Sequence, residues 1–361
     1  MSLESYLHAA PKAELHLHLE GSIRPETVLQ LARRNGVSLP AESVEGLREW
    51  YRFRDFRHFV EVYVAVSRCL RRAADYELIV YELGAELARQ HVRYAEVTFS
   101  PSTHELHLDV PHGTYFPGLS RGRERVKRDF GVDLAWVFDI VRATPILTAY
   151  ADYVTRVAIE GKDEGVVALG LGGLEAGNPP EPFAPWFERA RGAGLHSAPH
   201  AGEIAGPESV WGALRVLGAE RIGHGVRAAE DPTLVAHLVA SGVPLEICPT
   251  SNIRLGVYSN LAAHPLRALH DAGVRLTVNS DDPALFNTTL QDEVATLSQA
   301  FGFTESGADV RAVDEILLGG VRHSFLPPAQ KAALERDFRD RLDALKGEHL
   351  PGLAAPIAAT E

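Results

Sequence analysis

The stretch AELHLHLEGS, residues 13–22, has the alternation of a β-strand and carries two histidines on the same side. Side chains of a strand point alternately to its two faces. One face holds Leu15, Leu17 and Leu19, and the other holds Glu14, His16, His18 and Glu20. Two interpretations are open at this point. The strand is either half exposed with a polar outer face, or it projects two metal ligands into a cavity, because histidine is the commonest metal ligand.

Seven more short apolar runs follow this one, and longer segments with helical spacing separate them. The runs cover residues 94–99, 134–141, 166–172, 195–201, 221–225, 244–248 and 274–280. Helix signals lie between them: Asp231 is a candidate N-cap, Pro232 falls in the first turn, and Gly242 follows the expected end. Eight strand–helix repeats predict an α/β fold with a single (β/α)8 TIM-type barrel.

The alternative fold is an open, doubly wound sheet, but no glycine-rich nucleotide fingerprint follows the first run. We expect one domain over residues 1–361, with a core at about 11–325 and a C-terminal helix and loose tail at 326–361. A barrel needs about 250 residues, so the surplus is assigned to extra helices between the first and second strands, residues 20–93. The aromatic segment 51–66 within it is either core packing or a lid over the barrel mouth.

The composition excludes several classes of function. The chain carries a net charge of −12, whereas a general nucleic-acid surface is basic, so we expect no nucleic-acid partner. Two cysteines are too few for a disulfide framework. No secretory signal is visible, and no apolar run approaches the roughly 20 residues of a membrane span. We therefore expect a cytoplasmic protein with no membrane partner, and a homo-oligomer is left open.

Polar residues gather where several predicted strands end, which is the edge of a barrel that carries its active site. The first strand has His16 and His18, and the sixth has His224. The fifth ends with His200 and leads to Glu203, and the eighth leads to Asp281 and Asp282. Other histidines lie in polar stretches and are expected to be solvated, namely His58, His104, His107 and His112. Four strands that deliver such groups to one rim favour the metal interpretation of the first strand.

Three imidazoles and one carboxylate, from His16, His18, His200 and Asp281, are typical of a zinc site in a hydrolase. Zinc lowers the pKa of a bound water to about 7 and so supplies hydroxide at neutral pH. His224 would then orient or deprotonate that water. Glu203 is placed to act as a general acid if burial raises its pKa.

Five motifs give the chain a resemblance to a known family. PKAELHLHLEGS, HAGE, RIGHG, CPTSN and NSDDP resemble, in order and spacing, the motifs of the adenosine deaminase family of metal-dependent hydrolases. The resemblance runs from Pro11 to about residue 325. It implies one zinc ion per chain on the four ligands named above.

The resemblance also implies roles for the other site residues. Glu203 would donate a proton to purine N1, and His224 would activate the water and stabilise the charge that develops at C6. Asp282 would share a hydrogen bond with N7, and the backbone N–H of Gly173, in GLGGLE, would meet N3. The family often has aspartate where this chain has Glu20, near the ribose 5′-hydroxyl. Both Glu20 and the departure of GLGGLE from the family's aspartate-rich motif concern the ribose side of the pocket.

The expected function is therefore the hydrolytic conversion of the 6-amino group of an adenine-type purine to a 6-oxo group, with release of ammonia. Adenosine is the first expectation for this small-molecule substrate. Aminofutalosine, a 5′-modified nucleoside of the menaquinone pathway, and free adenine are the alternatives. A zinc amidohydrolase that cleaves another bond and a non-catalytic binding protein are weaker alternatives, because the acid, the histidine and all the ligands are intact.

Overall fold

The computed structural model describes residues 2–143 and 147–353, and over these residues eight parallel strands pair in chain order. They are β1 (Lys12–His18), β2 (Val92–Phe99), β3 (Asp133–Arg142), β4 (Val166–Gly173), β5 (His196–Ala201), β6 (Ile222–His224), β7 (Leu245–Ile247) and β8 (Leu276–Val278). The amide of His18 donates to the Asp281 carbonyl over 2.7 Å, and the amide of Asp281 donates to the His16 carbonyl over 3.1 Å. These two bonds join the end of β8 to β1 and close the predicted (β/α)8 barrel.

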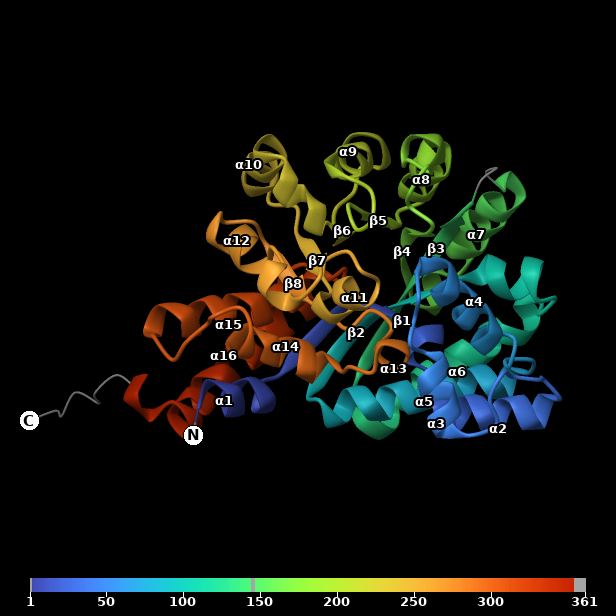
Figure 1. The fold of residues 1–361 in the computed structure, drawn as a ribbon, viewed down its shortest axis with the longest axis horizontal. Coiled ribbons are helices and arrows are strands. Elements are labelled where there is room, and N and C mark those ends of the chain that lie inside the picture. Colours follow the sequence, from blue (N-terminus) through green and yellow to red (C-terminus); the bar gives the residue numbers. More distant parts are fainter. Residues whose placement is uncertain (1, 144–146, 354–361) are drawn as a thin grey trace, which may run out of the picture.

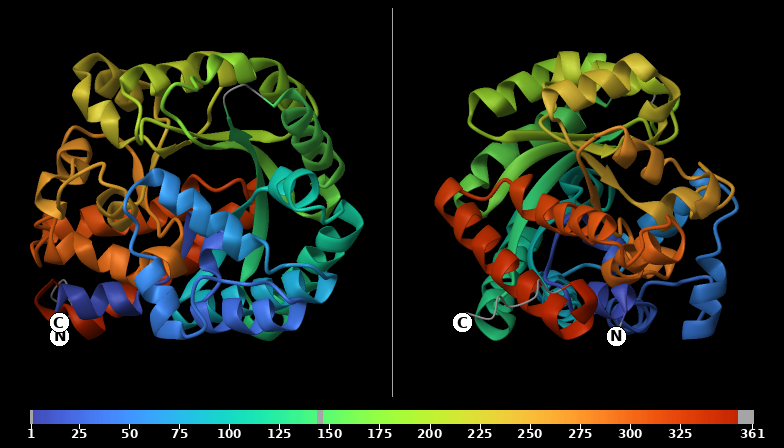
Figure 2. Two further views of the ribbon diagram at one scale, coloured as in Figure 1. Left: turned by 45° about the vertical axis from the view of Figure 1, so that its right-hand side comes forward. Right: turned by 90° about the vertical axis from the view of Figure 1, so that its left-hand side faces the viewer.

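Helices surround the strands, as Figures 1 and 2 show from three sides. They are α1 (Leu3–Ala9), α2 (Pro25–Asn35), α3 (Val44–Trp50), α4 (Phe56–Ser67), α5 (Ala73–Arg89), α6 (His112–Phe130), α7 (Thr148–Glu160), α8 (Ala184–Gly192), α9 (Pro207–Gly212), α10 (Pro232–Ser241), α11 (Pro249–Arg254), α12 (Leu266–Asp271), α13 (Pro283–Phe286), α14 (Leu290–Gln299), α15 (Gly307–Arg322) and α16 (Pro328–His349). The surplus between β1 and β2 forms α2 to α5, so the extra helices lie where the sequence predicts them. Residues 354–361 of the expected loose tail lie outside the described residues.

Local sequence signals explain where the helices begin and end. In α10 the side chain of Asp231 accepts the backbone N–H of Thr233 over 2.8 Å, as expected of an N-cap. Gly242 ends the same helix with a left-handed backbone, at a φ of 71°, which glycine adopts without steric cost. These are the capping roles that the sequence predicts for this helix.

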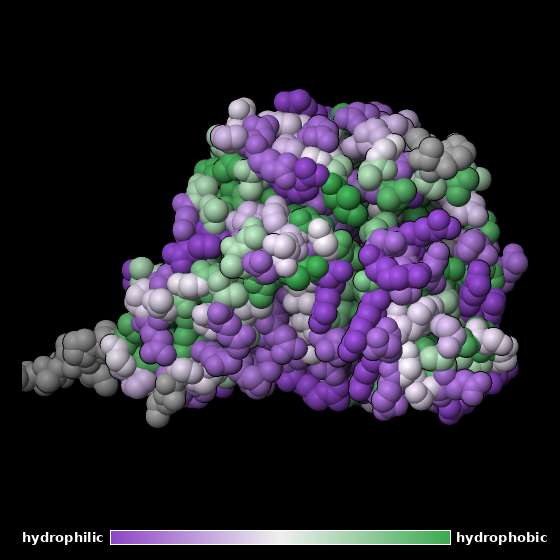
Figure 3. Space-filling model, viewed as in Figure 1, coloured by the Kyte–Doolittle hydropathy of each residue, from purple (hydrophilic) through white to green (hydrophobic). Residues whose placement is uncertain are grey.

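Strand β1 is buried on both faces, because the residues that it turns inward fill the barrel and the others pack under helices. All seven of its residues are buried, which excludes the half-exposed alternative. The outer surface is different: the face in Figure 3 is mostly hydrophilic, with apolar residues scattered near its centre. Cys69 and Cys248 are buried and unpaired. Among the described helices, none combines the length and the hydropathy that crossing a membrane requires.

Candidate active site

The ends of the strands bring the four predicted metal ligands to one point of the barrel mouth. His16 and His18 belong to the end of β1, His200 to β5, and Asp281 follows β8. The Nε2 atoms of His18 and His200 lie 3.2 Å apart. Asp281 Oδ1 lies 3.3 Å from His18 Nε2 and 3.4 Å from His16 Nε2. The four side chains are thus within reach of a single cation.

His224, at the end of β6, lies in the same cluster. Its Nε2 is 3.7 Å from Glu203 Oε1 and 3.9 Å from Asp281 Oδ2. Two overlapping groups of ligand atoms share Asp281: one adds His16, His200 and His224, and the other adds His18 and Asp282. His224 therefore belongs to the same group of candidate ligand atoms, and its place outside the ligand set stays a prediction. Burial lowers the pKa of His224 to about 3, which keeps the ring neutral.

The unused hydrogen-bonding groups of the cluster suit a metal ion. His16 Nε2 and His200 Nδ1 are buried and have no hydrogen-bond partner among the described residues. His16 Nδ1 lies 2.9 Å from Glu246 Oε2, and donation from this nitrogen leaves the lone pair of Nε2 facing the cluster. A histidine whose second nitrogen donates to a carboxylate is the usual arrangement of a metal-ligating histidine. Imidazole and carboxylate groups together fit a divalent transition metal.

Two residues of the cluster have a left-handed backbone although neither is glycine. The φ angle is 59° at His224 and 64° at Asp281, and such a conformation costs about 1–3 kcal/mol. Strain of this kind collects at functional sites, where the surrounding contacts hold it. The neighbouring Gly223 is needed for a different reason, since a Cβ there would lie 2.8 Å from His16 Cε1. The glycine of RIGHG therefore lets β6 pass close to a candidate ligand.

Glu203 is a buried carboxyl group beside these histidines. Burial raises its pKa well above the usual value of glutamate, and the negative charge of Asp281 adds to this effect. The loop that carries it is held by Glu175, whose carboxylate accepts the backbone N–H groups of Gly202 at 2.6 Å, Glu203 at 3.1 Å and Ile204 at 2.7 Å. The result is a fixed side chain that favours its protonated form, as a general acid requires.

Asp282 has a similar environment next to Asp281. Burial raises the pKa of Asp282 well above its usual value, and the charge of Asp281 acts in the same direction. Its Oδ1 is buried without a hydrogen-bond partner among the described residues. Gly21 makes room for this oxygen, because a Cβ at that position would lie 1.8 Å from it. The glycine of the LEGS motif is thus explained by the close approach of Asp282.

A cavity of about 110 Å³ lies above the cluster. The predicted residues that line it are His18, Gly173, His200, Glu203, His224, Asp281 and Asp282. Gly173 ends β4 with a φ of 81°, so a residue with a side chain would be strained there. A larger cleft of about 1060 Å³ is lined in part by Phe286, but by none of the predicted site residues. The smaller cavity is therefore the candidate active site.

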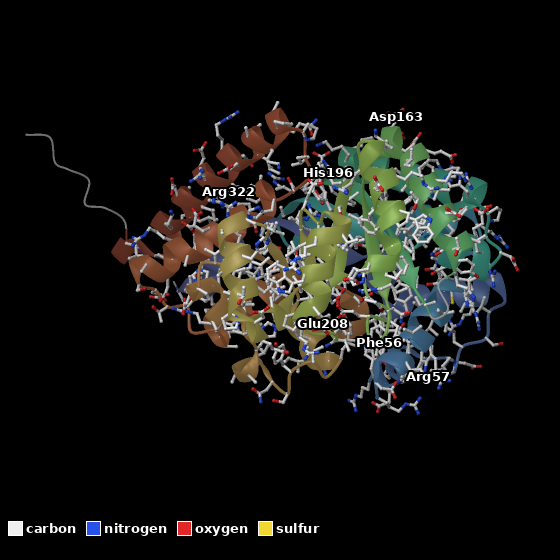
Figure 4. The ribbon with its side chains drawn as sticks, turned by 90° about the horizontal axis from the view of Figure 1, so that it is seen from above. Phe56, Arg57, Asp163, His196, Glu208 and Arg322 are labelled. Atoms are coloured by element: carbon white, nitrogen blue, oxygen red, sulfur yellow. The ribbon has the colours of Figure 1, made fainter. Side chains whose placement is uncertain are left out.

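Helix α4 supplies another wall of the cavity, through Phe56, Phe59 and Tyr63. The ring of Phe59 stacks on Phe286 of α13, with the ring centroids 5.5 Å apart. Figure 4 shows Arg57 beside Phe56 but directed away from the molecule, and the arginine side chain is 89% exposed. Part of the aromatic segment 51–66 thus covers the site, which favours the lid over simple core packing.

Glu20 lies in the turn after β1, η1 (Glu20–Ser22), and is fully buried. Its Oε1 accepts the Ser100 backbone N–H over 3.3 Å and lies 2.9 Å from His104 Nε2. Its Oε2 has no hydrogen-bond partner among the described residues. Burial alone would raise the pKa of Glu20, but the bond with His104 outweighs it and holds that pKa below its usual value. Glu20 therefore keeps one acceptor oxygen unused.

The expectation that His104 is solvated is wrong. Its ring is fully buried and stacks on Phe99 at 4.7 Å between ring centroids. The π-helical turn η2 (Thr103–His107) turns His104 inward and His107 outward. His58 is also buried, at 8% exposure, where solvation was expected. The turn that directs His104 inward cannot be read from a short polar run. His58 lies on a buried part of α4, where its Nδ1 accepts the backbone N–H of Arg54 over 3.3 Å.

Three buried charges close to the site were missed by sequence reasoning. Arg221 donates from Nε to Glu246 Oε1 and from Nη2 to Glu96 Oε2, both over 2.5 Å. Glu246 in turn faces His16. The sequence does contain a sign of this pairing. Glu96 and Glu246 are single carboxylates inside apolar strand-like runs, and a charged side chain in such a run is buried only when it is paired.

Comparison with known proteins identifies the family. The model of the adenosine deaminase family matches residues 11–341. The chain belongs to the adenosine deaminase family. It is accordingly a hydrolase that acts on the C–N bond of a cyclic amidine, in a family of metal-dependent enzymes.

Relatives within the adenosine deaminase family differ in substrate. The chain is 40% identical to an aminodeoxyfutalosine deaminase of Streptomyces coelicolor over 92% of this chain and 84% of that protein. It is 42% identical to an adenine deaminase of the same organism, over 81% of this chain and 85% of that protein. An amidohydrolase from Burkholderia ambifaria, solved with bound zinc, has a TM-score of 0.85 at 25% identity, and covers 96% of this chain and 94% of its own. These relatives support the two alternative substrates rather than adenosine.

Proposed function

We propose that this chain is a zinc-dependent deaminase that removes the 6-amino group of a purine nucleoside with a modified 5′ side. The observation that carries the proposal is that Glu203, His224 and Asp282 line one buried cavity together with a histidine–aspartate cluster. Hydrolysis adds water at C6, breaks the bond between C6 and the amino nitrogen, and releases ammonia. This reaction needs an acid, a group that orients water, and a metal-binding cluster, and residues of the cavity would fill each of these roles.

His16, His18, His200 and Asp281 would hold the zinc ion. Bound zinc would supply a water of lowered pKa, which is a better nucleophile at neutral pH. Glu246 would hold the ring of His16 in the orientation that a metal needs, through the contact of 2.9 Å with Nδ1. The two unpartnered ring nitrogens of the cluster support this assignment.

The remaining residues would bind the purine and move its protons. Glu203, held in its protonated form by burial, would donate a proton to N1 and make C6 more electrophilic. His224 would orient the water and stabilise the charge that develops at C6. Asp282 would share a hydrogen bond with N7, for which its raised pKa supplies a proton. The backbone N–H of Gly173, which lines the cavity, would meet N3.

Aminodeoxyfutalosine is the substrate that we propose first, and adenine is the second candidate. The aminodeoxyfutalosine deaminase of S. coelicolor matches 92% of this chain, whereas its adenine deaminase matches 81%. The Oε2 atom of Glu20 has no hydrogen-bond partner among the described residues, so it would be able to accept a sugar hydroxyl, which supports a nucleoside. The higher identity to the adenine deaminase keeps free adenine as the alternative.

A panel of 6-aminopurine compounds tests the proposal. The metal-loaded enzyme is mixed with aminodeoxyfutalosine, adenosine and adenine, and the change in ultraviolet absorbance from 6-amino to 6-oxo purine gives kcat/KM for each. We expect the highest kcat/KM for aminodeoxyfutalosine. A highest value for adenine would select the second candidate, and no turnover of any compound would refute deamination. Metal analysis of the same preparation tests for one zinc ion per chain.

A further inference from the structure

The CPTSN motif reaches the active site through its asparagine, and that contact is the last of a chain of hydrogen bonds. The chain runs from the backbone N–H of Leu266 to His264, from His264 to Asn252, and from Asn252 to His224. Its distances are 3.2 Å from Leu266 N to His264 Nδ1, 3.0 Å between His264 Nε2 and Asn252 Oδ1, and 3.4 Å between Asn252 Nδ2 and His224 Nδ1. All three side chains are buried, with exposures of 5% at His264, 0% at Asn252 and 1% at His224.

The first bond determines where the proton of His264 lies. A backbone N–H can only donate, so Nδ1 of His264 is an acceptor and carries no proton. Burial lowers the pKa of His264 to about 4, so the ring is neutral. A neutral imidazole with an acceptor at Nδ1 has its proton on Nε2. His264 therefore donates from Nε2 to the oxygen of Asn252.

The second bond then fixes the amide of Asn252. Its oxygen is occupied by the donor on His264, so its NH2 group must face His224. The opposite orientation would place two N–H donors against each other at Nε2 of His264. The amide of Asn252 consequently donates to Nδ1 of His224, and the proton of His224 lies on Nε2. That nitrogen is the one that faces Glu203 and Asp281.

We propose that Asn252 and His264 are positioning residues that hold His224 as a hydrogen-bond donor at Nε2 during deamination. The inference rests on the proposed function, because His224 matters only if C6 is attacked beside it. It decides between the two roles left open for His224. A ring with its proton on Nε2 does not accept the proton of the attacking water, but it donates a hydrogen bond to oxygen that gains charge at C6. Such preorganised donors stabilise charge in a site that excludes water.

Nuclear magnetic resonance of the metal-loaded enzyme labelled with 15N in its histidines tests this tautomer directly. We expect a pyrrole-type signal for Nε2 of His224 and a pyridine-type signal for Nδ1, assigned by comparison with His224→Gln. The measurement needs no substrate, so it stands even if the panel of purines shows no turnover. A pyridine-type signal at Nε2 in the wild-type enzyme would overturn the proposal.

Asn252→Asp tests the consequence for catalysis. The carboxylate accepts from both histidines, so it draws the proton of His224 to Nδ1 and leaves Nε2 without one. We expect kcat to fall at least about 100-fold with a much smaller change in KM, since fixing the wrong tautomer in a catalytic triad costs about 10⁴-fold. The 15N signals of His224 should exchange their types in this variant. A kcat within about threefold of wild type would overturn the proposal.

Three further variants separate positioning from mere folding. Asn260→Asp makes the same chemical change at an exposed asparagine that caps η7 (Leu261–Ala263), and it should leave kcat unchanged, because aspartate caps equally well. His264→Gln keeps an N–H donor toward Asn252, whereas His264→Phe keeps a ring without one. We expect His264→Gln to retain most of kcat and His264→Phe to lose it. Equal losses in both variants would show a structural role and would overturn the proposal.

Discussion

At the scale of single residues, burial decides the chemistry of Glu203 more than its place in the sequence does. An exposed glutamate is ionised at neutral pH, whereas burial and the nearby Asp281 raise the pKa of this one. Glu175 fixes its loop by accepting successive backbone N–H groups. Burial thus sets the acid strength of Glu203, and the bonds to Glu175 set its position.

Replacing Glu203 by glutamine removes the proton donor but keeps the size of the side chain. We expect kcat to fall by about 10²–10⁴-fold, the usual contribution of general acid catalysis, with the metal content unchanged. Steady-state kinetics and metal analysis measure the two effects. The exposed Glu188 on α8 is the control, and Glu188→Gln should leave kcat unchanged. Activity of Glu203→Gln within a few-fold of wild type would remove Glu203 from the mechanism.

His200→Ala tests the metal ligands. One of four proposed ligands is lost, so we expect less than one metal ion per chain after dialysis, because the remaining three bind more weakly. Atomic absorption of the dialysed protein gives the content. His107→Ala, at an exposed histidine, should retain metal as the wild type does. Stoichiometric, tightly held metal in His200→Ala would place the site elsewhere.

Glu20→Ala tests the sugar side of the pocket. A hydrogen bond to a charged group contributes about 1.5–3 kcal/mol, so we expect a corresponding rise in KM for the nucleoside substrate. Adenine has no sugar and should be affected much less, and zinc should remain bound. Kinetics with both compounds make the comparison. Equal losses would mean that Glu20 acts on the base or on the metal cluster.

At the scale of elements, α4 links the cover of the cavity to the residues beneath it. Phe59 stacks on Phe286, which ends the short helix that begins just after Asp282. Phe53 meets the same ring edge-on, with centroids 5.7 Å apart. The aromatic contact thus ties the position of α4 to the turn that holds Asp282, and any movement of α4 away from the cavity must break it.

Phe59→Ala should loosen this cover. The substrate loses apolar contact with the ring. Full burial of a phenylalanine contributes about 1.5–3 kcal/mol. We therefore expect kcat/KM to fall by the factor that corresponds to a free-energy loss within that range. Residues 51–66 should also be cut faster in limited proteolysis. Arg57→Ala, on the exposed side of the same helix, is the control. Unchanged kinetics and proteolysis in Phe59→Ala would show that α4 is static packing.

At the scale of the whole molecule, Arg221 connects distant parts of the barrel. Its guanidinium bonds Glu96 of β2 and Glu246 of β7, donates to the carbonyl of His323 over 2.9 Å, and lies 3.7 Å from the centroid of the Phe325 ring. It is 1% exposed. A buried cation between two carboxylates therefore joins two strands to the chain after α15.

Arg221→Met should destabilise the fold, because it leaves two buried carboxylates without their cation. Removing one partner of a buried ion pair costs about 3–5 kcal/mol, and thermal or denaturant unfolding measures it. The control is Arg322, which pairs with Glu315 and Glu335 nearer the surface. We expect Arg322→Met to cost less than about 1 kcal/mol. Similar losses in both variants would contradict this account of Arg221.

The sequence by itself determined the architecture and most of the candidate site. Apolar runs at strand length, with helical segments between them, predict the barrel, because each run needs cover on both faces. The position of His16, His18, His200 and Asp281 at strand ends then predicts that they meet, since the ends of parallel strands in a closed barrel share one rim. Periodicity and chain order suffice for both conclusions, and neither depends on side-chain packing.

Only the tertiary structure decided which way the intervening turns face. His104 lies in a polar run, yet a π-helical turn directs it to Glu20. Asn252 and His264 are twelve residues apart, yet they form one hydrogen-bonded chain behind His224. The orientation of a turn residue depends on contacts between segments that are far apart in the chain. The local pattern of apolar and polar residues does not predict these contacts.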